Sequence, residues 1–349
     1  MTTIDRGPAA PAAPIRKPPV LEATGVTKHF RVRSAGRTDV VQAVEDIDLS
    51  LVPGRIVALV GESGSGKTTL ARLLARFYPL TDGTIRLRGI SVSGRPDKEY
   101  FRSVQLIFQD PFGSLHPSHK ISYNLERPLR IHGHAKGRAD ARRQATELLE
   151  RVGLTPAEDY LDKLPYELSG GQRQRVVIAR ALAVRPAVLL GDEPISMLDV
   201  SIRLDMLNLL ARLRDEEGLA LLYITHDIAS ARYLCDDVAV MYAGQMIESG
   251  PKDAVIQRPM HPYTKLLVEA SPDPSRTHAA EFDDLDDDDV PDEPPSLVDP
   301  PAGCRFHPRC PFAMDECRRQ LPERTDLGDG HWARCWLHQK GRAGELLGP

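Results

Sequence analysis

The chain of 349 residues lacks the features that would place it inside a membrane or outside the cell. No apolar run reaches the roughly 20 residues that a membrane-spanning helix needs. The first 19 residues are rich in alanine and proline and lack the apolar core of a signal peptide, so we expect a disordered tail and no export. With a net charge of −4, the chain also lacks a global positive field, although local basic patches are compatible with this charge. We therefore expect no nucleic-acid partner.

Cysteine is scarce, but four of the five cysteines gather between residues 304 and 335. Their spacing, C-x5-C-x6-C-x17-C, lacks the C-x2–4-C pairs that are typical of structural zinc sites. In a reducing cytosol, metal ligation is favoured over disulfides. A [4Fe–4S] cluster has four irons that each need one thiolate, and wider loops suit a ligand of that size. We therefore favour a [4Fe–4S] cluster over zinc, and place disulfides third, with these ligands: Cys304, Cys310, Cys317 and Cys335. Cys235 lies in an expected helix and is interpreted as a buried thiol.

The hydrophobic pattern predicts a mixed α/β fold. Residues 20–60 alternate apolar and polar side chains, which indicates short antiparallel strands. The apolar run 55–61 predicts a buried strand, and the helix after it has Leu70, Leu73, Leu74 and Phe77 on one face and is expected to end at Pro79. Further buried strands are predicted at 187–192 and 219–225, after helices at about 120–165. Strands that alternate with helices imply a mostly parallel sheet covered on both faces.

The segment GESGSGKTT (61–69) has the G-x-x-x-x-G-K-[ST] pattern of a phosphate-binding loop. It follows an expected buried strand and opens an amphipathic helix, and this context disfavours a glycine-rich turn with an incidental lysine. The glycines let successive backbone N–H groups face a phosphate. Lys67 is expected to reach the β- and γ-phosphates, and the Thr68 hydroxyl to bind Mg²⁺. The candidate nucleotide-binding residues of this loop are Gly61, Ser63, Gly64, Ser65, Gly66, Lys67, Thr68 and Thr69.

Two carboxylates follow the apolar strand in LLGDEP (189–194). Asp192 is placed to hold Mg²⁺, directly or through water, and Glu193 to orient and polarise the attacking water. On its own, such a pair could also be negative charge at the start of a helix. With a phosphate loop upstream, catalysis is the better interpretation.

The segment LSGGQRQR (168–175) contains two adjacent glycines at an expected helix start. Ser169 and Gln172 also fit a capping box, so a purely structural role is a real alternative. Each glycine weakens a helix by about 1 kcal/mol relative to alanine, which suggests that a phosphate approaches the bare backbone of Gly170 and Gly171.

The order GESGSGKTT, LIFQD, LSGGQ, LLGDEP, YITHD resembles the ATP-binding cassette (ABC) ATPases over about residues 20–255. The resemblance implies an ABC-type nucleotide-binding domain with a RecA-like parallel-sheet core, an antiparallel β subdomain and a helical subdomain at about 110–180. It also implies ATP and Mg²⁺ as ligands, and a second cassette whose LSGGQ segment completes each ATP site in trans.

The same resemblance implies roles for single residues. Phe30 takes the place of the aromatic that stacks on adenine, although a plain core phenylalanine is the alternative. Gln109 resembles the glutamine that senses Mg²⁺ and water, and Asp199 the aspartate that crosses the dimer interface. His226 resembles the histidine that contacts the γ-phosphate. The chain departs from the usual pattern with Ile195 and Met197, which leave both carboxylates in place, so we expect hydrolytic competence.

Two further stretches, 110–135 and 258–272, resemble the ATPase subunits of oligopeptide/dipeptide and nickel importers. The C-terminal cysteine pattern is also similar to that family's [4Fe–4S]-binding one. The resemblance implies an ATPase at the cytoplasmic face of the membrane that drives peptide uptake with a second ATPase subunit, two integral-membrane permeases and an extracytoplasmic solute-binding protein. The alternatives are an importer of nickel or another small solute, and a soluble ABC ATPase with a metal-binding cysteine module.

Composition divides the chain into five expected parts. HPYTKLL (261–267) predicts a helix with Pro262 in its first turn and Leu266 and Leu267 on its buried face. The acidic, proline-rich stretch before the cysteines predicts a solvated linker. The expected parts are a tail (1–19), the cassette (20–255), a helical region (256–280), the linker (281–303) and the cysteine module (304–349).

Overall fold

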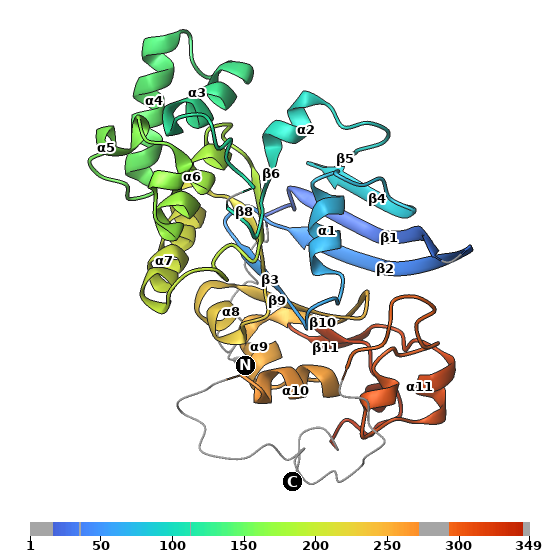
Figure 1. Ribbon diagram of the computed structural model, residues 1–349. Helices are drawn as coiled ribbons and strands as arrows, with labels where there is room; N and C mark the ends of the chain where they lie inside the picture. Colours follow the sequence, from blue (N-terminus) through green and yellow to red (C-terminus); the bar gives the residue numbers. More distant parts are fainter. Residues whose placement is uncertain (1–16, 35, 112, 272–292, 345–349) are drawn as a thin grey trace, which may run out of the picture.

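The computed structural model describes residues 17–34, 36–111, 113–271 and 293–344. These residues form two sheets with helices around them (Figure 1). The smaller sheet has the order β2-β1-β4-β5. Its strands are β1 (Leu21–Ser34), β2 (Arg37–Leu51), β4 (Asp82–Leu87) and β5 (Ile90–Ser91). All its neighbours are antiparallel, as predicted, but β1 and β2 are long strands of 14 and 15 residues.

The larger sheet carries the core of the fold and has the order β11-β12-β10-β9-β3-β8-β7-β6. The strands from β9 to β6 pair in parallel, which confirms the predicted α/β class. The predicted strands at 55–61, 187–192 and 219–225 are β3, β7 and β8, and each is buried along its length. The strand bounds are β3 (Ile56–Val60), β6 (Val104–Ile107), β7 (Val188–Asp192), β8 (Ala220–Thr225), β9 (Asp237–Tyr242), β10 (Gln245–Pro251), β11 (Thr325–Gly328) and β12 (His331–Ala333).

Helices of the middle of the chain stand apart from the smaller sheet, at the upper left of Figure 1. They pack on one another through buried leucines and isoleucines such as Ile121, Leu125 and Leu149. They are α3 (Ile121–Ile131), α4 (Arg138–Arg151), α5 (Glu158–Leu161), the short 3₁₀ helix Pro165–Glu167 and α6 (Gly170–Leu182). The remaining helices of the cassette are α1 (Lys67–Leu74), α2 (Lys98–Ser103), α7 (Val200–Glu217), α8 (Ile228–Leu234) and α9 (Lys252–Gln257).

Helix α1 ends earlier than its sequence predicts. Arg76 has a left-handed backbone (φ 60°), its N–H donates to Leu73 O, and the N–H of Phe77 donates to Arg72 O. This pair of bonds is a Schellman motif, which ends a helix without waiting for a proline. The expectation that Pro79 ends the helix and that Phe77 shares its buried face is therefore wrong. Phe77 is 56% exposed and contacts the ring of Phe108.

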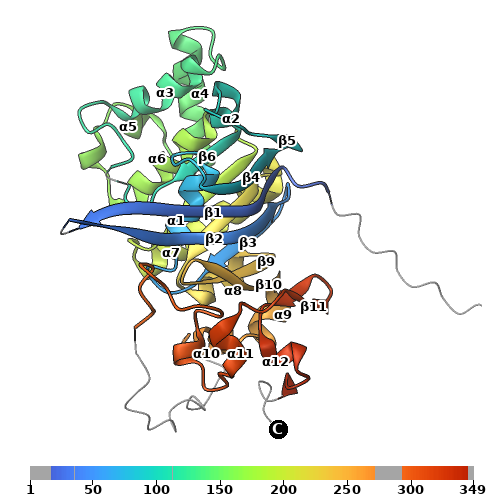
Figure 2. The same cartoon turned by 90° about the vertical axis from the view of Figure 1, so that its right-hand side faces the viewer.

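The C-terminal region is built onto the cassette rather than separated from it (Figure 2). Strand β12 pairs with β10, so the hairpin β11–β12 extends the central sheet. Cys304, Phe306 and Cys317 belong to the same buried cluster as the cassette core, so the cysteine region shares that core. The helices of this region are α10 (Pro262–Glu269), the 3₁₀ helix η2 (His307–Arg309), α11 (Asp315–Arg319) and α12 (Trp336–Gln339).

The residues just before the cysteines also contact the cassette. Val298 forms a β-bridge with Val41, and the N–H of Gln42 donates to Leu297 O over 2.8 Å. The end of the expected 281–303 linker is thus anchored on β2. Residues 281–292 of that linker, the 1–16 part of the expected tail and residues 272–280 of the helical region lie outside the described residues.

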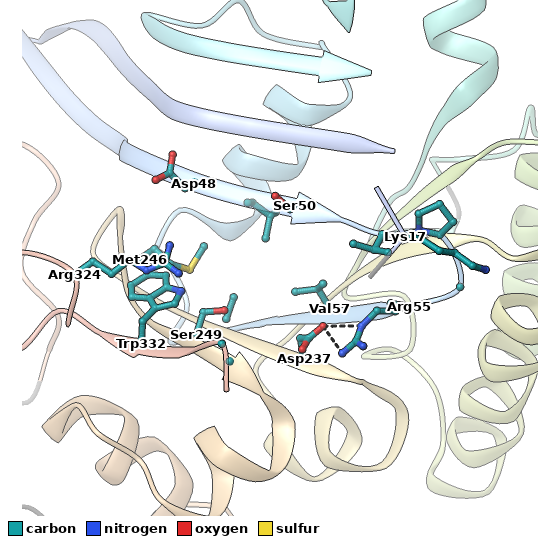
Figure 3. Close-up of a pocket in the computed structure, with 17 residues that line it drawn as sticks. Lys17, Asp48, Ser50, Arg55, Val57, Asp237, Met246, Ser249, Arg324 and Trp332 are labelled. Atoms are coloured by element: carbon teal, nitrogen blue, oxygen red, sulfur yellow. Dashed lines mark hydrogen bonds and ion pairs between the residues drawn. The ribbon is translucent and has the colours of Figure 1, made fainter. Parts of the chain in front are cut away.

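A cavity of about 610 Å³ lies between β2 and the strands β3, β9, β10 and β12 (Figure 3). At one end, the Arg324 guanidinium lies 4.5 Å from the centre of the Trp332 ring. Farther along, Arg55 and Asp237 form an ion pair at 2.8 Å. The C-terminal hairpin therefore supplies one wall of a space between the two sheets.

Candidate nucleotide site

The loop Gly61–Gly66 joins β3 to α1 and folds around its own lysine. The Lys67 ammonium donates to the carbonyls of Gly61 and Glu62, both at 2.7 Å. Gly66 has φ 101°, and a Cβ added there would lie 2.3 Å from Ala43 O. Only glycine fits this position, because the loop passes close to the backbone of β2. The backbone N–H groups at the start of α1 are the expected phosphate ligands.

Lys67 is only 5% exposed, although it carries a charge. Burial lowers the pKa of Lys67, and the nearby carboxylates of Glu193, Asp192 and Glu62 oppose that shift. The ammonium also donates to the Ser65 hydroxyl over 3.2 Å, and a buried cation whose hydrogen-bond acceptors are neutral oxygens attracts an anion strongly. This environment suits a phosphate group.

Thr68 and Asp192 approach each other from α1 and the end of β7. The Thr68 hydroxyl donates to Asp192 Oδ1 over 2.9 Å, and Asp192 is 3% exposed. Burial raises the pKa of Asp192, and the hydrogen bond from Thr68 opposes the rise. A hydroxyl and a buried carboxylate are hard oxygen ligands, so this donor set fits Mg²⁺. When bound, the ion would neutralise charge on the transferred phosphoryl group.

Glu193 receives one hydrogen bond from each of two further predicted catalytic residues. Its Oε2 accepts from the amide of Gln109 over 3.0 Å, and its Oε1 lies 3.2 Å from Nδ1 of His226. These three side chains follow β6, β7 and β8, whose carboxyl ends share one edge of the parallel sheet. Glu193 itself has a left-handed backbone (φ 47°), a conformation that non-glycine residues adopt at a cost and that is common at functional sites.

The LSGGQ segment begins α6 and shows the capping box that its sequence allows. The N–H of Gln172 donates to Ser169 Oγ over 3.2 Å, and the N–H of Ser169 donates to Gln172 Oε1 over 3.0 Å. A Cβ at Gly171 would lie 2.7 Å from Cγ2 of Ile202 in α7. Packing against α7 is therefore a second reason for glycine here, besides the expected phosphate. The structure does not join Ser169, Gly170, Gly171 or Gln172 to the phosphate loop of the same chain by a hydrogen bond among the described residues.

Phe30 and Asp199 lie at the edges of this arrangement. The Phe30 ring makes an edge contact with Tyr78, with centroids 5.4 Å apart, and lies 4.9 Å from the Lys28 ammonium. Phe30 is partly exposed. Asp199 is exposed before α7, beside the exposed Met197. Ile195, the other departure from the usual pattern, is buried at 4% exposure.

The four C-terminal cysteines line one small cavity. Its other walls are largely apolar and include Phe312, Met314 and Leu337. Its volume is about 10 Å³, smaller than a four-iron cube, so binding one requires these side chains to move apart. Within the described residues, no three or more His, Cys, Asp or Glu side chains are arranged to hold a single metal ion. Cys235 lies elsewhere and is buried, as expected, and burial raises its pKa.

The sequence analysis did not predict two contacts of the phosphate loop. The N–H of Glu62 donates to the hydroxyl of Tyr263 over 2.8 Å, and the Glu62 carboxylate pairs with Arg309 at 2.9 Å. Tyr263 is one of the buried residues of α10, whereas Leu266 and Leu267, which were expected to be buried, are only partly so. These contacts join residues about 200 or more positions apart, and no local pattern indicates them.

The fold and this phosphate loop define a nucleotide-binding protein, and comparison with known proteins identifies its family. Residues 44–196 match the ABC transporter family, and residues 247–317 match the oligopeptide/dipeptide transporter C-terminal region. A probable peptide ABC transporter ATP-binding protein of Sinorhizobium fredii is 38% identical over 94% of this chain and 92% of its own length. A putative oligopeptide transport ATP-binding protein of Bacillus subtilis is 39% identical over 95% of this chain and 100% of its own.

A solved structure supports the same family assignment for the cassette. The dimeric, post-hydrolysis ATP-binding cassette MJ0796, bound to ADP and Pi, is 28% identical, with a TM-score of 0.59 over 66% of this chain and 98% of its own. The chain belongs to the ABC transporter ATP-binding subunits of the oligopeptide/dipeptide type, and its cassette is an ATPase. No helix among the described residues has the length and apolar character needed to cross a bilayer.

Proposed function

We propose that this chain is the ATP-hydrolysing subunit of an importer that takes up peptides. The observation that carries the proposal is the convergence of Gln109, Glu193 and His226 beside the Thr68–Asp192 pair. The C-terminal region then selects the peptide branch of the family, because residues 247–317 match that region and relatives of nearly full length are named as peptide transport subunits.

In the proposed mechanism, Lys67 and the loop N–H groups bind the β- and γ-phosphates, and Thr68 and Asp192 hold Mg²⁺. Glu193 accepts a proton from the attacking water, and Gln109 and His226 fix the orientation of its carboxylate. Phe30 stacks on the base. Ser169 to Gln172 and Asp199 act on the ATP of a second cassette. In support, no hydrogen bond among the described residues joins Ser169 to Gln172 with the phosphate loop of their own chain.

The proposed partners follow from this incomplete site. A second ATPase subunit completes it, two integral-membrane permeases dock on the helical subdomain at the cytoplasmic face, and an extracytoplasmic binding protein delivers the solute. Expression with the permeases and detergent purification tests this assembly: co-purification with MgATP-dependent uptake of labelled peptides supports it. A fully active ATPase that finds no membrane partner would favour a soluble ABC ATPase, and uptake of Ni²⁺ instead of peptide would favour a metal importer.

The four cysteines form the second part of the proposal, a [4Fe–4S] site with zinc as the alternative. Support comes from the convergence of Cys304, Cys310, Cys317 and Cys335 in apolar surroundings. Thiolates are soft ligands that suit both metals, but a single-ion arrangement is not formed by the described residues. When bound, the cluster would add ligation energy to the folding of this region.

Metal analysis of protein purified without air tests the cluster. We expect about four irons and four acid-labile sulfides per chain, with absorbance near roughly 400 nm. Cys317→Ser should lower the iron content, whereas Cys235→Ser, which changes the buried thiol outside the group, should not. A colourless protein that holds one zinc would replace the cluster by the zinc alternative.

A further inference from the structure

The segment between the first two clustered cysteines reaches into the candidate ATP site. Arg309, one residue before Cys310, directs Nη1 at both carboxylate oxygens of Glu62, at 3.1 and 2.9 Å. Its side chain is 12% exposed and that of Glu62 is 29% exposed, so water screens this pair only in part. The contact joins the cysteine region to the second residue of the phosphate loop.

Glu62 is held from three directions. Its side chain binds Arg309, its N–H donates to the Tyr263 hydroxyl, and its carbonyl accepts from the Lys67 ammonium over 2.7 Å. Since Lys67 is the predicted phosphate-binding cation, a rotation of the Glu62 backbone would move the anchor of that cation. The orientation of Glu62 therefore matters for how the loop presents Lys67 to a phosphate.

A second arginine of the same segment supports the other side of the loop. Arg305, 4% exposed, donates to Ala243 O over 2.5 Å and to the side-chain oxygen of Gln42 over 2.5 Å. The neighbouring N–H of Gly244 donates to Ser65 O over 2.8 Å. Between the two arginines, the Phe306 ring packs on Tyr242 and Tyr263, with centroids 5.3 and 5.5 Å away. Arg305, Phe306 and Arg309 thus contact residues that support the phosphate loop.

We propose that Arg309 is a positioning residue of the ATP site, which holds Glu62 and through it the phosphate loop and Lys67 in the geometry that binds MgATP. Arg309 touches neither the expected nucleotide nor the reacting atoms, so it acts on affinity rather than on the chemical step. If the [4Fe–4S] proposal holds, the cysteine site and the ATP site are also coupled through this segment, since a change that moves Cys310 moves Arg309. Such coupling is reciprocal by thermodynamic necessity.

The experiment compares Arg309→Ala, Arg309→Lys and the matched control Arg318→Ala in the full chain assembled with its partners. Arg318 carries the same charge in the same region and is exposed. Loss of a partly buried ion pair should raise the Kd and KM for MgATP about tenfold in Arg309→Ala. At saturating MgATP, kcat should stay within about twofold, because the catalytic residues are untouched. Arg309→Lys should be intermediate, since lysine keeps the charge but loses the planar guanidinium.

The Glu62→Gln variant and the double variant Glu62→Gln/Arg309→Ala complete a double-mutant cycle. If the pair acts as proposed, the double variant binds MgATP no more weakly than Arg309→Ala alone. An unchanged Kd in Arg309→Ala would overturn the proposal, as would a loss confined to kcat with a lowered melting temperature, which indicates a merely structural role. Iron and zinc contents measured on the same samples separate this outcome from a failure of the cluster proposal.

Discussion

Nδ1 of His226 lies 3.2 Å from Oε1 of Glu193, across the ends of two neighbouring parallel strands. Gln109 binds the other oxygen of the same carboxylate from the strand on the far side. A carboxylate held on both oxygens has a fixed direction, which is what a general base needs before its substrate arrives.

Glu193→Gln should abolish most hydrolysis and leave nucleotide binding intact. Glutamine has nearly the same shape but accepts no proton, so ATPase turnover of the assembled complex should fall about 10²- to 10⁴-fold. The Kd for MgATP should change little, and ATP-bound dimers should accumulate, which size-exclusion chromatography can detect. Glu216→Gln, an exposed change on α7, is the control. Turnover that continues at the parent rate in Glu193→Gln would show that another group activates the water.

Gly171→Ala should damage the fold as well as the expected contact with a partner's ATP. The added methyl would lie 2.7 Å from Ile202 Cγ2, an overlap that costs about 1–3 kcal/mol in the free energy of unfolding. Shortening the neighbour with Ile202→Ala should remove this clash, so the double variant should unfold like Ile202→Ala alone in urea.

The same double variant separates packing from signalling to the second cassette. If a phosphate also needs the bare backbone at Gly171, ATPase activity should stay low although stability is matched to Ile202→Ala. Full recovery of activity together with stability would mean that packing against α7 is the whole reason for this glycine.

Phe30→Ala should weaken ATP binding about tenfold, because stacking of a base on an aromatic ring contributes about 1–3 kcal/mol. Phe30→Trp should retain affinity, and Phe101→Ala, a change at an exposed ring that makes an edge contact with Tyr100, should be neutral. Binding of a fluorescent ATP analogue gives the Kd for each variant. Equal affinity of Phe30→Ala and the parent would make Phe30 a core residue that packs on Tyr78.

The stability of the helical subdomain should depend on pH through His134. Burial, with the positive charge of Arg185 adding to it, lowers the pKa of His134, so the folded chain keeps the ring neutral. The unfolded chain takes up a proton below about pH 6.5, so stability is fully present above that pH and is lost as the pH falls toward the folded pKa. His134 Nε2 also lies 3.2 Å from Val184 O.

Urea midpoints measured between about pH 7.5 and pH 5.5 check this dependence. His134→Gln keeps a donor for Val184 O but cannot titrate, so its midpoint should fall less than that of the parent on acidification. An identical loss in both proteins would assign the pH dependence to other groups, of which the neighbouring His132 is one, since its pKa is also lowered by burial.

The resemblance carried by the motif order assigned Gln109, Glu193 and His226 to one ATP site. In the structure these side chains lie together at the edge where the carboxyl ends of the parallel strands meet, although they lie up to 117 positions apart in the sequence (109 to 226). The motif order could also predict Thr68 beside Asp192, since each closes a buried strand or opens the helix after it.

The sequence does not predict contacts that depend on how distant segments pack against one another. Nothing local in RFHPRC (305–310) indicates that Arg309 meets Glu62, and Tyr263 looked like any residue of a helix whose leucines would be buried. The early end of α1 was missed for a different reason. Arg76 has the left-handed backbone conformation that glycine or asparagine usually adopts at a helix end, so the residue types gave no indication that the helix ends there.

The pairing of β12 with β10 predicts how a shortened chain would behave. A fragment that stops after α10 would leave the backbone at Glu248 and Ser249 without the neighbouring strand β12, and would remove His331 from Glu248, a carboxylate with 0% exposure. The unpaired N–H and C=O groups of an exposed strand edge can pair with a strand of another chain. Such a fragment should aggregate through this strand, so we expect the cysteine region to protect the sheet edge and keep the ATPase from aggregating.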